Sequence, residues 1–237
     1  MDDMNHNFEK ANDAFRLPLF SIGLVLAYFI SQVFTFILLA KLTNQDLLEM
    51  STELKFYAVA ANAGLWIAIT TSLIPKLPLP KMKTKSLEEN LKVYLSGIGL
   101  LYLCIILFNL ILSTTNFKPQ TQDVANQVIK MSESSLFLII LGPVLLVPLV
   151  EELLFRNLLH KSLKIKFSPL IASIISAFLF GLAHMEIDTI PQLVVIGLVL
   201  SYTYEKSGSI WVPAALHATN NFVTVMILIY LPKASGA

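Results

Sequence analysis

Three short polar motifs interrupt otherwise apolar stretches of this sequence. They are residues 151–156 (EELLFR), 180–184 (FGLAH) and 217–221 (HATNN), which together supply two carboxylates, a guanidinium, two imidazoles and side-chain amides. An ionisable group at the centre of a membrane helix costs about 2.5–3.5 kcal/mol on insertion scales. A chain that keeps several such groups is expected to use them, so the motifs predict a polar site within the bilayer. The types of group present suit hydrolysis.

The composition is that of an integral membrane protein. Of the 237 residues, 55% are hydrophobic and 14% are charged, whereas a soluble domain has about 25% charged residues. The net charge of +1 gives no indication of nucleic-acid binding. The single cysteine, Cys104, lies in an apolar run, which excludes a disulfide framework and a cysteine-based metal site.

The apolar stretches predict an all-α fold, a polytopic membrane helix bundle with about seven transmembrane helices. A span needs about 20 apolar residues. The candidates are 17–40, 54–74, 91–113, 135–160, 168–185, 190–205 and 209–231. We divide the chain into N-terminal transmembrane helices with a surface segment (1–134) and a core that carries the motifs (135–231). The segment 114–134 is interpreted either as a short helix on the membrane surface or as a solvated loop.

The basic residues predict the orientation of these spans. Segments 76–92 and 156–166, the N-terminus and Lys206 fall on one side and carry 12 of the 17 basic residues. Because cytoplasmic loops carry the excess of Lys and Arg, we expect a multi-pass plasma-membrane protein with a cytoplasmic N-terminus. The basic stretch 76–85 is interpreted as a topology signal that contacts anionic lipid.

The fourth span carries the carboxylates. Pro148 cannot donate a hydrogen bond to the carbonyl of Val144, so we expect the helix to open beside Glu151. Glu152 and Arg156 are spaced i,i+4 and can pair on one face. Glu151 lies about 100° away with no local basic partner, and an unpaired carboxyl in a dry site is suited to act as a general base. The alternatives are a kinked packing helix and a structural ion cluster.

The two histidine motifs are ambiguous when taken singly. His184 lies i,i+4 from Phe180, and His217 shares a face with Asn221 at the same spacing; each could be an ordinary packing residue. The expected positions of these residues along the membrane normal favour a single site that contains them. If spans four and five turn near Lys166, Glu151 is 15 residues before the turn and His184 is 18 residues after it. At about 1.5 Å per residue, the two lie at similar heights.

This arrangement suits peptide hydrolysis by an activated water, without a covalent intermediate. Glu151 would take a proton from the water, with His184 holding the water or sharing the proton. His217 and Asn221 would donate hydrogen bonds to an oxyanion, each worth about 2.7–4 kcal/mol when preorganised.

Two other catalytic patterns are absent from the sequence. There is no His-Glu-x-x-His helix and no Gly-x-Ser-x-Gly elbow. Zinc remains an alternative, held by Glu151, His184 and His217, with Glu152 a further candidate ligand. Because two histidines on separate spans are a small ligand set, we predict no bound cofactor.

The three motifs, in this order on separate membrane helices, resemble the CPBP family. That family comprises type II CAAX prenyl endopeptidases and bacterial relatives linked to bacteriocin processing and self-immunity. Its pattern is Glu-Glu-x-x-x-Arg, then Phe-x-x-x-His, then His-x-x-x-Asn/Asp, and the resemblance covers about residues 135–225. The matching residues are Glu151, Glu152, Arg156, Phe180, His184, His217 and Asn221.

The resemblance implies a helical intramembrane endopeptidase in which glutamate activates water. It implies Glu151 as the base, His184 as its partner, and His217 with Asn221 as the oxyanion site. The expected substrate is a membrane-associated peptide or protein, such as a peptide pheromone or bacteriocin leader, rather than a prenylated protein. The alternatives are a non-cleaving bacteriocin immunity or scaffold protein and a proton-coupled transporter. A transporter predicts broken helices in repeated halves, and no such symmetry is evident.

Overall fold

The computed structural model describes residues 2–46, 50–115 and 136–230, with side chains from residue 16 onward, and this part contains helices and no strand. The prediction of an all-α bundle is therefore confirmed. The predicted surface segment 114–134 lies outside the described residues except for its first two. The elements are α1 (Asp2–Leu42), α2 (Thr52–Leu73), η1 (Ile74–Lys76), α3 (Leu87–Ser113), α5 (Leu136–Ile139), η3 (Ile140–Leu146), α6 (Val147–Glu152), η4 (Leu153–His160), α7 (Lys161–Leu163), α8 (Pro169–Ala183), α9 (Ile190–Ser207) and α10 (Trp211–Tyr230).

Five helical stretches are long and apolar enough to cross a membrane. They are Arg16–Leu42, Thr52–Lys76, Leu87–Ser113, Leu136–Leu163 and Trp211–Tyr230. The predicted spans 168–185 and 190–205 form α8 and α9, helices of 15 and 18 residues that fall outside this set. The number of long spans among the described residues is thus smaller than the predicted seven, although every predicted stretch is helical.

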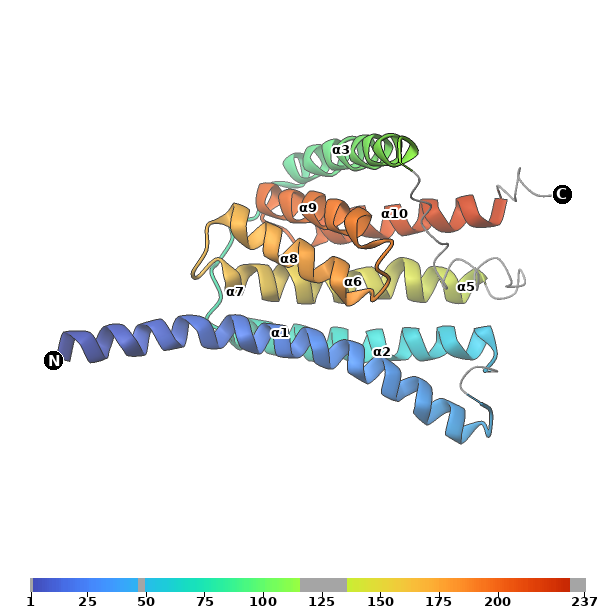
Figure 1. Ribbon diagram of the computed structural model, residues 1–237, viewed down its shortest axis with the longest axis horizontal. Coiled ribbons are helices and arrows are strands. Elements are labelled where there is room, and N and C mark those ends of the chain that lie inside the picture. Colours follow the sequence, from blue (N-terminus) through green and yellow to red (C-terminus); the bar gives the residue numbers. More distant parts are fainter. Residues whose placement is uncertain (1, 47–49, 116–135, 231–237) are drawn as a thin grey trace.

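The stretch Leu136–Leu163 runs through the middle of the bundle (Figure 1). Helices α1 and α2 pack on one side of it, and α8, α9 and α10 pack on the other, with α3 outermost against α9 and α10. The polar motifs on α6, η4, α8 and α10 therefore face one another across the interior. The fourth span is the element that every other part of the site contacts.

Helices α8 and α9 form an antiparallel hairpin inside the bundle. Its connecting turn, residues 184–189, lies short of the ends of α2, α5 and α10 (Figure 1). Small residues allow the close packing of the two helices. A methyl group added to Gly197 would lie 3.0 Å from the Cα and Cβ atoms of Ala177. His184, which directly follows α8, is half-buried at the start of the connecting turn.

The basic segments gather at one end of the bundle. The backbone N–H of Lys85 donates to the Ser207 carbonyl at 3.1 Å, and Thr84 Oγ1 donates to the Gly208 carbonyl at 3.2 Å. The linker between α2 and α3 is thereby tied across the turn between α9 and α10. Gly208 ends α9 at φ +65°, and a Cβ there would collide with the carbonyl oxygen of Lys83. The grouping of these segments agrees with the predicted topology, whereas the orientation in the membrane stays a prediction.

We expect Gly208→Ala to lower the free energy of unfolding by about 1–2 kcal/mol or more. A non-glycine residue in the left-handed region costs about that much, and the collision with Lys83 adds to it. The check is thermal unfolding of the purified protein in detergent. The matched control is Gly99→Ala on α3, where an added methyl meets no atom within 4 Å. An equal loss in both variants would contradict the tie between linker and turn.

Candidate active site

The glutamate pair lies between two π-helical segments. The unbroken helical stretch Leu136–Leu163 contains η3 and η4, both π-helices, on either side of the six-residue α6 that ends at Glu152. π-Helical turns are rare and occur frequently at functional sites. The predicted opening of the helix is therefore present as two widened turns that flank Glu151 and Glu152.

Asn221 binds a carbonyl that the first widened turn leaves available. The N–H of Val147 donates to Gly142, five residues back. In this register the carbonyl of Pro143 faces the nitrogen of Pro148, which has no hydrogen. Asn221 Nδ2 donates to the Pro143 carbonyl at 3.0 Å. The sequence placed the freed carbonyl at Val144 by assuming four-residue spacing, and the π register moves it by one residue.

Glu152 is the most highly coordinated carboxylate of the site. Arg156 Nη1 donates to Glu152 Oε1 at 3.0 Å, and His217 Nδ1 lies 3.0 Å from the same oxygen. Because an ionised carboxylate only accepts hydrogen bonds, His217 carries its hydrogen on Nδ1. The predicted Glu152–Arg156 pair is present, and both side chains are fully buried. The contact with His217, 65 residues away along the chain, was not predicted.

Arg156 joins three elements around its guanidinium. Its Nη2 donates to the Gly197 carbonyl on α9 at 3.1 Å. Its guanidinium carbon lies 4.7 Å from the ring centroid of Phe180 on α8. This is within the range of a cation–π interaction, which is strongest when both groups are shielded from water. The fully buried charge therefore has a carboxylate, a carbonyl and an aromatic face as neighbours.

Glu151 faces the other nitrogen of His217. Its side chain is 5% exposed, and its Oε2 lies 3.8 Å from His217 Nε2. This separation is too long for a direct hydrogen bond. With the hydrogen on Nδ1, Nε2 presents its lone pair toward Glu151. The imidazole of His217 thus lies between the two glutamates, hydrogen-bonded to Glu152 and open toward Glu151.

His184 is in contact with the ring of Phe180. Its ring centroid is 4.9 Å from that of Phe180, and its Nδ1 lies 2.9 Å from the Phe180 carbonyl oxygen. The ring of His217 is 5.6 Å from the same phenyl group. Among the described residues, no hydrogen bond or ion pair joins His184 to Glu151. The structure brings His217 next to Glu151, and both histidine rings contact Phe180. The catalytic role predicted for His184 stays a prediction.

The groups predicted as oxyanion donors already have partners. The donor N–H of His217 is directed at Glu152, and one amide hydrogen of Asn221 is directed at Pro143. The second amide hydrogen of Asn221 remains for a substrate. The oxyanion role of this pair stays a prediction.

The described residues contain no group of three or more His, Cys, Asp or Glu side chains placed to hold a metal ion. The alternative zinc ligands Glu151, His184 and His217 are not gathered at one point within this part of the chain.

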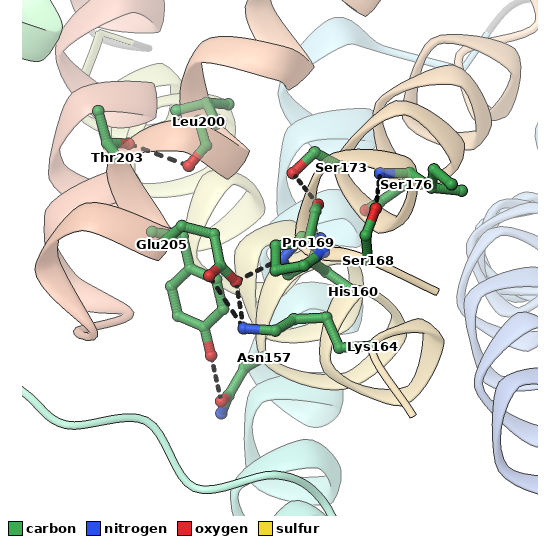
Figure 2. Close-up of polar contacts among 12 residues, drawn as sticks. Asn157, His160, Lys164, Ser168, Pro169, Ser173, Ser176, Leu200, Thr203 and Glu205 are labelled. Carbon is green, nitrogen blue, oxygen red and sulfur yellow. Dashed lines mark hydrogen bonds and ion pairs between the residues drawn. The ribbon is translucent and has the colours of Figure 1, made fainter. Parts of the chain in front are cut away.

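A second polar cluster lies at the basic end of η4 and was missed by sequence reasoning. His160 Nε2 lies 2.8 Å from Glu205 Oε1, and Lys164 Nζ donates to both carboxylate oxygens of Glu205 at 2.6 and 2.9 Å (Figure 2). The available signal was the i,i+4 spacing of Arg156, His160 and Lys164 along the fourth span. Its partner on α9 is a long-range contact that no local spacing reveals.

Comparisons with known proteins support the resemblance found in the motifs. Residues 133–223 match the family model of Type II CAAX prenyl endopeptidase Rce1-like proteins. The "Putative membrane peptidase YdiL" of Bacillus subtilis (strain 168) is 30% identical over 82 residues, which cover 34% of this chain and 34% of the relative's length. The "Membrane-embedded CAAX protease MroQ" of Staphylococcus aureus (strain USA300) is 24% identical over 232 residues, covering 90% and 91% of the two chains. No solved structure matches. The family resemblance is thus confirmed for the part of the chain that carries the three motifs.

We expect Arg156→Ala to destabilise the protein more than Glu151→Ala. Removing Arg156 leaves a buried carboxylate at Glu152, and breaking a buried pair costs about 3–5 kcal/mol. Glu151 loses only the longer contact with His217. Melting temperatures of the two purified variants in detergent provide the measurement. Equal melting temperatures would refute the interpretation that Glu152 and Arg156 form a structural pair from which Glu151 is separate.

Proposed function

From the family resemblance and the geometry around His217, we propose that this multi-pass membrane protein is an endopeptidase. It hydrolyses a peptide bond of a membrane-associated peptide or protein by means of a water molecule activated by Glu151. One observation carries the proposal: His217 is oriented by Glu152 on one side and faces Glu151 on the other, at 3.0 and 3.8 Å. Two adjacent carboxylates thus have different surroundings, which is how one site obtains a structural and a reactive carboxyl.

The reaction follows from this geometry. Glu151 accepts a proton from a water molecule while the water oxygen attacks the carbonyl carbon of the peptide bond. The tetrahedral intermediate then collapses, the bond from carbon to nitrogen breaks, and Glu151 returns the proton to the leaving amine. The products are a carboxyl group and an amine, and Glu151 is again ionised. Such general acid–base action contributes about 10²–10⁴-fold to the rate.

His217 has two tasks in this scheme. Its Nε2 lone pair accepts a hydrogen bond from the water and directs the second proton of that water away from Glu151. Glu152 holds the ring in the required tautomer, as a carboxylate does for a catalytic histidine. If His217 becomes protonated, its Nε2–H can donate to the oxyanion, and the contact with Glu152 stabilises that charge. Asn221 offers its second amide hydrogen to the same oxygen, and His184 remains a candidate for holding the water.

The substrate class is inferred from the setting of the site. The site residues belong to helices of a bundle with five candidate membrane spans, so the peptide reaches it from the bilayer or its surface. One relative's printed name refers to CAAX substrates; for this chain we propose a peptide or protein associated with the membrane, without a prenyl requirement. We also propose a cytoplasmic N-terminus, because the basic segments gather at the end of the bundle where α1 begins (Figure 1).

We expect Glu151→Gln to lower cleavage by at least about 100-fold while the amount of protein in the membrane stays near normal. Glutamine keeps the shape of the side chain but cannot accept the proton. The measurement compares the membrane peptides of cells that carry the native protein, Glu151→Gln, or the control Glu88→Gln. Glu88 forms an exposed ion pair with Lys92 on α3. Full activity of Glu151→Gln would overturn the hydrolase mechanism and leave a binding role, such as immunity or scaffolding.

We further expect hydrolysis without a tightly bound metal ion. Among the residues of the three motifs, only His184 and His217 offer imidazole nitrogens, and a zinc-activated water would compete with the role given to Glu151. The test is metal analysis of the purified active protein, followed by exhaustive chelation. Near-stoichiometric zinc, with activity lost on chelation and restored by zinc, would reassign Glu151, His184 and His217 as ligands and leave Glu152 as the candidate base.

A further inference from the structure

The cluster of His160, Lys164 and Glu205 has no part in the mechanism above, although it is among the best-connected polar groups in the described residues. The side chain of His160 is fully buried, and those of Lys164 and Glu205 are 18% and 24% exposed. Glu205 accepts hydrogen bonds from both partners at 2.6–2.9 Å (Figure 2). Burial raises the pKa of Glu205, but the hydrogen bonds from His160 and Lys164 outweigh this effect and hold the pKa below its ordinary value. Glu205 lies outside the five long helical stretches that could cross a membrane.

The cluster joins the same two elements that meet again at the active site. Near the basic end, Glu205 fixes α9 to His160 of η4 and to Lys164, which directly follows α7. Farther in, the Gly197 carbonyl of α9 accepts from Arg156 of η4. Eight residues of regular helix separate Glu205 from Gly197, which corresponds to about 12 Å along the axis. A shift of α9 along or around its axis at Glu205 would therefore move the Gly197 carbonyl away from Arg156.

From Gly197 inward, the contacts form an unbroken series to the reactive carboxyl. Arg156 donates to the Gly197 carbonyl at 3.1 Å and to Glu152 at 3.0 Å. Glu152 accepts from His217 at 3.0 Å, and His217 faces Glu151 at 3.8 Å. The Gly197 end has little freedom of its own, because an added methyl group there would already press on Ala177.

We propose that Glu205 is a positioning residue. Through His160 and Lys164 it holds α9 at the height where the Gly197 carbonyl meets Arg156, and it thereby fixes the orientation of His217 that Glu152 imposes. The consequence for catalysis rests on the proposed peptidase function. The effect of Glu205 on the orientation of the His217 ring does not depend on that function, and it is tested without a substrate.

The test uses nuclear magnetic resonance of the full-length purified protein in detergent, with ¹⁵N-labelled histidine. The chain has four histidines, and the His217 signals are assigned by their loss in His217→Gln. In Glu205→Ala we expect the ring nitrogens of His217 to shift and the fraction with hydrogen on Nδ1 to fall. Glu205→Gln retains one acceptor oxygen and is expected to give a smaller shift. Glu88→Ala removes an exposed ion pair on α3 and is expected to leave the His217 signals unchanged.

A second variant guards against misfolding of Glu205→Ala. Lys164→Met removes one partner of Glu205 from the partly exposed side and keeps most of the side-chain volume, so the His217 shift should have the same direction and a smaller size. Unchanged His217 signals in whichever of these two variants folds would overturn the proposal. A shift of the same size in Glu88→Ala would also overturn it, because the effect would then be unspecific.

Activity separates this inference from the proposed function. With a substrate, Glu205→Ala should lower kcat by up to about 100-fold with KM little changed, because small misplacements of catalytic groups have effects of that order. If His217 shifts but Glu151→Gln cleaves normally, the positioning role stands and the peptidase proposal fails. If Glu151→Gln is inactive and His217 does not respond to Glu205, the reverse holds.

Discussion

The fully buried pair of Glu152 and Arg156 is the constraint around which the rest of this bundle is arranged. Two charges removed from water are costly unless their remaining hydrogen-bonding groups find partners. Several of those partners come from elsewhere in the chain: the imidazole of His217 on α10, the carbonyl of Gly197 on α9, and the ring of Phe180 on α8. Glu152 Oε2 and Arg156 Nε are buried and have no hydrogen-bond partner among the described residues. The pair, on α6 and η4, thus contacts three further helices at one point.

This arrangement explains why adjacent glutamates differ. Glu152 accepts hydrogen bonds from a guanidinium and an imidazole, whereas Glu151 has a histidine nitrogen just beyond hydrogen-bonding distance. The Oε1 atom of Glu152 is therefore held by two donors, whereas Glu151 Oε2 lies 3.8 Å from His217 Nε2. Consecutive carboxylates thus have different surroundings, which the proposed division between a structural and a reactive carboxyl requires.

The sequence predicts what depends on local spacing and misses what depends on long-range contacts. The i,i+4 spacing was sufficient for the Glu152–Arg156 pair, and apolar length was sufficient for the helical fold. The partner of Glu151 was predicted to be His184 from similar heights along the membrane, and that role stays a prediction. Height does not determine the rotation of a helix, and the rotation of α10 places His217 within 3.8 Å of Glu151. The π register at Pro143, which redirects Asn221, has no signal beyond the two prolines. Glu205 was overlooked because its partners are more than 40 residues away.

The short α8–α9 hairpin has a consequence for the lipid around the protein. Its turn stops short of the ends of the longer helices (Figure 1), and there Met185 and Ile187 are 74% and 82% exposed beside the half-buried Glu186 and Asp188. Carbonyl and carboxylate groups of an irregular turn are not tolerated against hydrocarbon chains, and they require protein or water around them. The bilayer must therefore thin or admit interfacial water down to this turn. A peptide that reaches His184 would leave the hydrocarbon at an indented boundary inside the membrane, rather than at its ordinary surface.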